Sequence, residues 1–212
     1  MDVVAHVRVQ DSGTASERSR HSDEGVVLWL TPVENSPAKL STAPLSHYQL
    51  VQKDKQFQPH LLVVSVGSIV DFPNRDPFFH NVFSLFNGRK FDLGLYESGK
   101  SRSVHFDRAG VSFIFCNIHP EMSAVVVSVP TLYFASSMPD GSLLIHGVEP
   151  GTYDMHLWAI GSGDNLSSAQ VHRVVVRESS TDLGVFTVQT SPVGPHKNKF
   201  GEDYPMQHPE QY

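Results

Sequence analysis

The stretch VSFIFCNIHPEMSAVVVSV, residues 111–129, decides how the chain folds. Two apolar runs of strand length, Val111–Cys116 and Ala124–Val129, flank a short polar loop. Runs of four to eight residues rich in β-branched and aromatic side chains favour buried strands. We therefore expect the loop to join two adjacent strands at one end of a β-sandwich.

The loop carries three side chains that bind soft metals. Cys116, His119 and Met122 are each separated by two residues, and they offer a thiolate, an imidazole and a thioether. Two histidines and a cysteine with a weak axial methionine are the ligands of electron-transfer copper sites. The loop supplies one histidine, so a second has to come from elsewhere in the chain. His80, in the segment Phe78-Phe79-His80-Asn81, is the natural candidate.

Short predicted strands follow one another closely through the middle of the chain, and no helical period interrupts them. Gly67-Ser68, Asn87-Gly88 and Gly110 punctuate the series as turns. Such spacing is typical of an all-β sandwich. The predicted strands are Tyr48–Gln52, Phe57-Gln58, Leu61–Val66, Ile69–Phe72, Asn81–Phe86, Phe91–Tyr96, Ser101–Phe106, Val111–Cys116 and Met122–Val129.

The pattern His80-Asn81 followed by Cys116-x-x-His119-x-x-Met122 resembles the cupredoxins of the plastocyanin and amicyanin group. The resemblance covers about residues 48–130. It implies a Greek-key sandwich that holds one type 1 copper ion. His80, Cys116 and His119 would be the equatorial ligands, and Met122 the axial ligand. Asn81 would form a hydrogen bond near the cysteine, which pins the loop and tunes the reduction potential.

The two ends of the chain predict a second sandwich. Val3–Val9 alternates with polar residues, and Gly25–Leu30 is a continuous apolar run that fits a strand covered on both faces. The segment from Asp140 to Tyr153 resembles the carboxypeptidase regulatory-like, transthyretin-type fold. We expect a discontinuous domain into which the cupredoxin domain is inserted, as in bacterial exported methylamine-utilisation or plastocyanin-like proteins; three consecutive pieces are the alternative. The expected domains are 1–31 with 131–190, 48–130, and an extended tail, 191–212.

Composition excludes some classes of partner. The formal net charge is −6 and the pI is about 6.0, so the basic face that nucleic acid requires is absent. No apolar run approaches the roughly 18 residues of a membrane span. The start, Met1-Asp2-Val3-Val4, does not resemble a signal peptide. A copper site favours export, so we expect a periplasmic or otherwise exported protein whose signal lies outside this sequence.

A carrier of single electrons between redox protein partners is the function that these residues favour, with no catalytic residues. Cys116 is flanked by Phe115 and Asn117, and not by histidines that would connect it to a second copper. Pro77, Phe78, Phe79 and Pro120 could frame an apolar docking patch around His119. The alternatives are a protein that holds or delivers copper and a structural interaction module. The remaining histidines, including His60 and His105, form no ligand spacing.

Overall fold

A computed structural model describes residues 1–12, 25–33, 46–85, 88–179, 181–194 and 196–204. Strands and one 3₁₀ turn, η1 (Leu166–Ser168), are the regular structure in these ranges, so the prediction of an all-β chain is confirmed. No helix in the described ranges is long and apolar enough to cross a membrane. The polar residues 11–24 and the proline-rich residues 32–47 are expected from the sequence to form a loop and a linker, and they fall largely outside the described residues.

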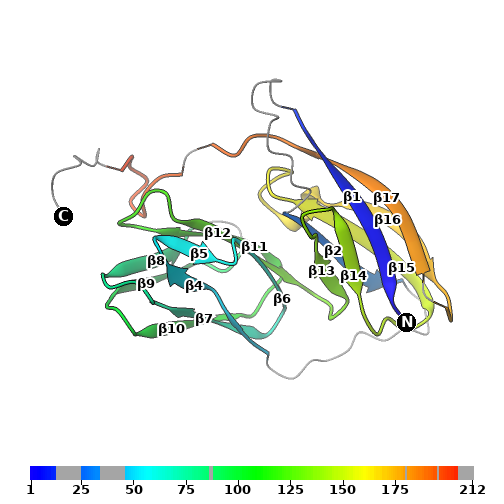
Figure 1. Cartoon of the computed structure of the whole chain (residues 1–212), viewed down its shortest axis with the longest axis horizontal. Coiled ribbons are helices and arrows are strands. Elements are labelled where there is room, and N and C mark those ends of the chain that lie inside the picture. The colour runs from blue at the N-terminus through cyan, green and yellow to red at the C-terminus, as the bar shows by residue number, and fades with distance from the viewer. Residues whose placement is uncertain (13–24, 34–45, 86–87, 180, 195, 205–212) are drawn as a thin grey trace.

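Two groups of sheets lie side by side (Figure 1). The central module has a five-stranded sheet in the order β6-β12-β11-β8-β9, a three-stranded sheet in the order β10-β7-β3, and the β4-β5 hairpin. Its strands are β3 (His47–Gln49), β4 (Val51–Lys53), β5 (Gln56–Gln58), β6 (Leu61–Ser65), β7 (Ser68–Pro73), β8 (His80–Ser84), β9 (Phe91–Tyr96), β10 (Ser101–Phe106), β11 (Gly110–Cys116) and β12 (Ser123–Val129).

The flanking module is built from both ends of the chain. Its sheets have the orders β14-β1-β17 and β13-β2-β15-β16, so the first two strands pair only with strands that follow the central module. These strands are β1 (Val3–Asp11), β2 (Val26–Pro32), β13 (Phe134–Ser136), β14 (Ser142–Ile145), β15 (Gly151–Ala159), β16 (Gln170–Val176) and β17 (Thr181–Thr190). The division into domains and the transthyretin-type fold stay predictions, and these pairings favour the insertion.

The segment predicted as one strand, Tyr48–Gln52, is divided in two. Leu50 separates β3 from β4, and its side chain is fully buried. Its backbone N–H donates to the carbonyl of Asp71 on β7 (2.9 Å). The chain therefore leaves one sheet at Leu50 and enters the β4-β5 hairpin, a change of partner that local hydrophobicity does not encode.

Strand β2 contributes side chains to two cores. Val26, Leu28 and Leu30 pack inside the flanking module, whereas Val27 and Trp29 face the central module. The predicted covering of this strand on both faces is therefore confirmed. Each module has a hydrophobic core of its own, and Val27 and Trp29 belong to a third hydrophobic cluster, which lies between the two modules. The other buried members of this third cluster are Val63, Val111, Val125, Val127, Val129 and Trp158. The modules thus share a continuous apolar contact.

Candidate metal centre

The strand order brings together residues that are distant in sequence. β11 ends at Cys116, and residues 117–122 form the loop that leads to β12. β8 runs antiparallel to β11, with Cys116 opposite Val82. Because the end of β11 lies beside the beginning of β8, His80 adjoins the loop.

The candidate ligand atoms form a small triangle. The Cys116 Sγ atom lies 3.5 Å from His80 Nδ1 and 3.6 Å from His119 Nδ1, and the two Nδ1 atoms are 3.2 Å apart. Within the described ranges, these three residues are the group of His, Cys, Asp or Glu side chains whose ligand atoms could hold a metal ion. The sequence selected the same three residues.

The triangle lies below the protein surface. His80, Cys116 and Met122 are fully buried, whereas His119 keeps 9% of its surface exposed. Met122 belongs to the same hydrophobic cluster as Cys116. The assignment of all four residues as metal ligands stays a prediction, and His119 is the member of the set that reaches solvent.

Backbone hydrogen bonds close the loop on itself. Cys116 N–H donates to the carbonyl of Met122 (3.2 Å), and Met122 N–H donates to the carbonyl of His119 (3.1 Å). Because this second bond keeps Met122 in the loop, β12 begins at Ser123, one residue later than predicted. The loop thus has a fixed backbone between its cysteine and its methionine.

Asn81 holds the loop chiefly through its backbone. Its carbonyl accepts from Asn117 N–H (2.9 Å), and its own N–H faces the Cys116 sulfur. Its side-chain amide instead donates to Asp92 Oδ1 on β9 (2.7 Å). The hydrogen bond expected near the cysteine is therefore present, but it comes from the main chain.

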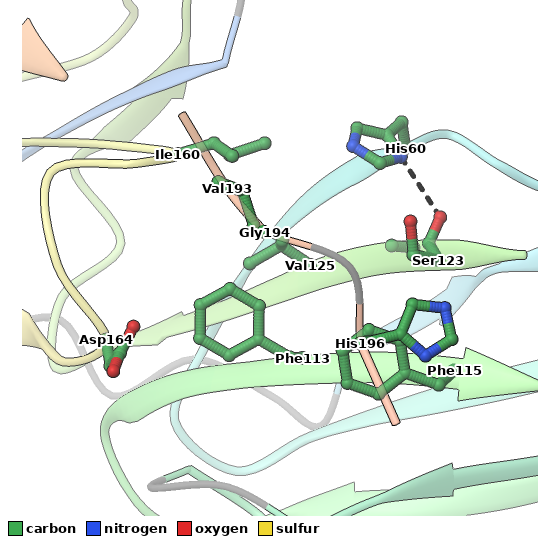
Figure 2. A pocket seen from close by; sticks show the side chains of 11 residues that line it. His60, Phe113, Phe115, Ser123, Val125, Ile160, Asp164, Val193, Gly194 and His196 are labelled. Carbon is green, nitrogen blue, oxygen red and sulfur yellow. Dashed lines mark hydrogen bonds between the residues drawn. The ribbon is translucent and has the colours of Figure 1, made fainter. Parts of the chain in front are cut away.

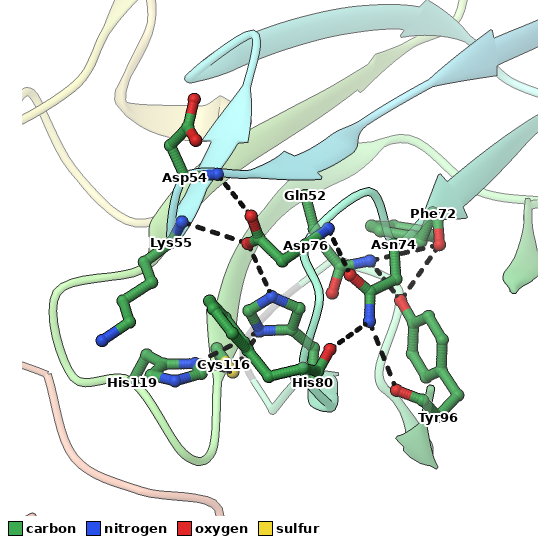
Figure 3. Close-up of polar contacts among 11 residues, drawn as sticks. Gln52, Asp54, Lys55, Phe72, Asn74, Asp76, His80, Tyr96, Cys116 and His119 are labelled. Atoms are coloured by element: carbon green, nitrogen blue, oxygen red, sulfur yellow. Dashed lines mark hydrogen bonds and ion pairs between the residues drawn. The ribbon is translucent and has the colours of Figure 1, made fainter. Parts of the chain in front are cut away.

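Asp76 orients the first histidine, a role that the sequence analysis missed (Figure 3). His80 Nε2–H donates to Asp76 Oδ2 (2.9 Å), which leaves the Nδ1 lone pair directed at the triangle. The same carboxylate accepts from the backbone N–H groups of Asp54 (2.6 Å) and Lys55 (3.1 Å). The only sign of this role in the sequence is that Asp76 precedes His80 by four residues.

The tip of the β4-β5 hairpin is shaped to meet this carboxylate. Asp54 and Lys55 have φ angles of 56° and 54°, the left-handed conformation that a two-residue turn of this kind requires. Residues other than glycine adopt it at some cost. The two hydrogen bonds to Asp76 offset that cost, and the hairpin is thereby attached to the candidate metal centre.

A buried amide fixes the loop that carries Asp76. Asn74 Oδ1 accepts from Asp76 N–H (2.9 Å), and Asn74 Nδ2 donates to the carbonyl of Phe78 (2.8 Å). Next to it, Gln52 donates to the Tyr96 hydroxyl, and Tyr96 donates to the carbonyl of Phe72 (3.0 Å). This polar network connects the loop that supports His80 to β4, β7 and β9.

Burial sets the protonation states. It lowers the pKa of His80 and of His119, although Asp76 opposes the shift at His80. Burial also raises the pKa of the Cys116 thiol, and hydrogen bonds from the backbone N–H groups of Asn81, Ile118 and His119 partly offset this increase. Both imidazoles are therefore neutral and available as ligands at neutral pH, and a metal ion would displace the thiol proton on binding.

Phe78 packs against both histidine rings. Its ring centroid lies 5.3 Å from that of His80 and 5.3 Å from that of His119. The neighbouring Phe79 is 50% exposed, and it lines a cleft whose other members are Leu95, Tyr96, Glu97, Lys100, Ser101 and Arg102. Phe78, which packs against the one candidate ligand that reaches solvent, thus lies between two exposed residues, Pro77 and Phe79.

No family model matches the sequence, and no curated protein matches it. Solved structures that resemble part of the chain include cupredoxins. One is a purple cupredoxin from Nitrosopumilus maritimus, 22% identical with a TM-score of 0.34, over 39% of this chain and 98% of that chain. Another is a Cu(I) amicyanin variant, 22% identical with a TM-score of 0.37, over 48% of this chain and 97% of that chain. A copper-containing nitrite reductase from Thermus scotoductus SA-01 is 21% identical with a TM-score of 0.39, over 48% of this chain but only 28% of that chain.

Proposed function

We propose that this protein binds one copper ion and passes single electrons between protein partners. His80, Cys116 and His119 are the proposed equatorial ligands and Met122 the axial ligand. The observation that carries the proposal is the triangle of ligand atoms, with edges of 3.2, 3.5 and 3.6 Å. Nitrogen and sulfur ligands with metal bonds of about 2.0–2.3 Å lie roughly 3–4 Å apart around a shared ion.

The chemistry of the donor set fits copper. Thiolate and thioether sulfur with imidazole select soft and borderline metals, and the nearest carboxylate, Asp76, is already engaged with His80 and the hairpin. When bound, copper supplies a one-electron redox couple. The chain itself excludes water from three of the four donors and holds them on strands and a hydrogen-bonded loop. Donors that stay in place suit a metal that changes oxidation state quickly.

The surface beside His119 fits a protein partner. His119 is the ligand with exposed surface, Phe78 touches it, and the residues on either side of Phe78, Pro77 and Phe79, are exposed. Apolar surface of this kind is suited to brief docking between proteins. We propose this patch as the place where electrons enter and leave.

Copper delivery is the alternative, and burial argues against it. A delivery site has to release its metal readily, whereas His80, Cys116 and Met122 have no exposed surface. Release would require the loop from Cys116 to Met122 to open. Slow loss of copper to a chelator is expected for a carrier, and rapid loss would favour delivery.

An absorption spectrum of the copper-loaded protein tests the proposal. Cu(II) bound to a cysteine thiolate should give intense visible absorption and a reversible one-electron couple. Cys116→Ser should remove the absorption while the protein still folds, and His60→Gln, at an exposed histidine of the same module, should leave it unchanged. Retained colour in the Cys116→Ser variant would refute the ligand assignment.

We also propose that the protein is a carrier rather than an enzyme, and that it works in an exported compartment. The residues that flank Cys116 are Phe115 and Asn117, so no adjacent histidine links it to a second copper. Turnover of nitrite or oxygen by the copper-loaded, reduced protein would contradict the carrier role. Detection of the protein in the cytoplasmic fraction alone would contradict export.

A further inference from the structure

The chain returns to the metal centre after its last strand. Beyond β17 it crosses from the flanking module to the central module (Figure 1), where residues 196–204 lie against the loop that carries Cys116. We name this segment the C-terminal strap. The sequence predicts an extended tail over residues 191–212, of which residues 195 and 205–212 lie outside the described residues.

The strap contacts the residues on both sides of the Cys116 peptide bond. The Tyr204 hydroxyl donates to the carbonyl of Cys116 (2.8 Å), and Lys199 N–H donates to Asn117 Oδ1 (3.0 Å). Neither bond involves a candidate ligand atom. Both restrain the backbone from which the Cys116 side chain extends.

A closed ring of hydrogen bonds links the strap to Asn81 and Asn117, the residues that directly follow His80 and Cys116. Lys199 Nζ forms an ion pair with Asp92 Oδ2 (2.8 Å), and Asp92 Oδ1 accepts from Asn81 Nδ2 (2.7 Å). The Asn81 carbonyl accepts from Asn117 N–H (2.9 Å), and Asn117 Oδ1 accepts from Lys199 N–H. The strap, β9, β8 and the loop are thus joined in one ring.

Aromatic rings complete the contact. The His196 ring stacks on Phe115, with ring centroids 4.0 Å apart and an interplanar angle of 25° (Figure 2). Tyr204 meets His196 edge-on at 5.3 Å. Phe115 directly precedes Cys116, so the strap touches residues 115, 116 and 117 in succession.

We propose that the C-terminal strap is part of the metal centre, with Tyr204 and Lys199 as positioning residues that keep the Cys116 thiolate in place. Loss of a residue that supports a metal ligand typically weakens metal binding about 10–100-fold. Here that support comes from the end of the chain, which no local pattern around Cys116 reveals. The part of the proposal that concerns copper rests on the proposed function; the restraint of the loop does not.

Modification of the Cys116 thiol in the metal-free, full-length protein tests the restraint. A fully buried thiol reacts with a disulfide reagent only when its surroundings open locally. Tyr204→Phe removes the bond to the Cys116 carbonyl, and Lys199→Met removes the ion pair to Asp92 while the backbone bond from residue 199 to Asn117 stays. Each variant opens the ring of contacts at one point, and each should raise the reaction rate about fivefold. Tyr133→Phe, in the flanking module, and Lys197→Met, whose ion pair to Asp203 stays within the strap, should leave the rate within about twofold.

Unfolding by urea and spectra of the copper form complete the experiment. Faster thiol reaction without an equal loss of global stability, with a shift of the visible band in the same variants, supports the strap's role. Equal rates in all four variants, or rate increases that merely follow global stability, overturn it. If the wild-type protein shows no copper colour, the proposed function fails, and the thiol rates still decide whether the strap restrains the loop.

Discussion

Asp76→Asn is expected to weaken copper binding while the fold is kept. The substitution preserves the shape of the side chain but replaces one acceptor oxygen with an NH₂ group. The carboxylate accepts three hydrogen bonds, from Asp54 N–H, Lys55 N–H and His80 Nε2–H, at 2.6, 3.1 and 2.9 Å. An amide leaves at least one of these donors facing another donor. If the NH₂ group faces His80, the ring loses its acceptor; if the oxygen faces His80, the neutral amide is a weaker acceptor than the carboxylate. In both cases the tautomer that directs the Nδ1 lone pair at the triangle is held less strongly.

The size of the effect follows from these contacts. Loss of one hydrogen bond to a charged acceptor costs about 1.5–3 kcal/mol of folding stability. Removal of a carboxylate that orients a metal-binding histidine weakens metal binding about 10–100-fold. Copper binding adds to the free energy of unfolding, and at saturating copper this added stability should be about 1.4–2.7 kcal/mol smaller in the variant than in the wild type. The Asp76 side chain is only 4% exposed, so solvent does little to screen the loss.

Chelator competition and urea unfolding, each with and without copper, measure the two effects separately. Burial alone would raise the pKa of Asp76, but hydrogen bonds from His80, Lys55 and Asp54 lower it, so the group is ionised at neutral pH. Asp71→Asn is the matched control, because Asp71 pairs with Ser103 and His47 away from the metal centre. Wild-type copper affinity in a destabilised Asp76→Asn variant would refute the orienting role and leave Asp76 as a support of the hairpin alone.

Three further outcomes are expected. Met122→Leu should keep the visible colour and raise the reduction potential in a redox titration, because loss of a weak axial donor disfavours Cu(II); a lowered potential would contradict the axial assignment. Burial lowers the pKa of His156 below its ordinary value of 6.5, so the stability that the neutral ring contributes is lost as the pH falls below 6.5. His156→Gln should make the free energy of unfolding less dependent on pH in this range, as measured by urea titrations; an unchanged dependence on pH would exclude this contribution of His156. Trp158→Ala should cost about 3–5 kcal/mol of unfolding free energy, because the ring is fully buried between the modules, and a cost below about 1 kcal/mol would count against the third cluster.

Much of the architecture could be predicted because its signals are local. Apolar runs predict the strands on both sides of the loop, and Cys116, His119 and Met122 all lie within one segment of seven residues. His80 could be placed with them because it directly precedes the predicted strand Asn81–Phe86. Strand boundaries agree to within one or two residues wherever hydrophobicity decides them, as at β9 and β10.

The support of the site could not be predicted, because its partners are distant and often backbone atoms. Asp76 is recognised only once the Asp54-Lys55 turn is known to point at it. Tyr204 bonds to a carbonyl, a group that every residue possesses, so its side chain leaves no trace in the pattern around Cys116. Leu50 changes sheets for a similar reason. Such contacts depend on how segments meet in space, and their signal appears only in the folded chain.

The third hydrophobic cluster has a practical consequence for the whole molecule. Valines of β12 alternate between the interior of the central module and the surface that receives Val27, Trp29 and Trp158. A fragment that began near residue 46 and stopped near residue 130 would present that valine face to water, and it would be prone to aggregate. In solution the two halves should tumble as a single particle, so that a partner seated on either half meets the other in a fixed orientation.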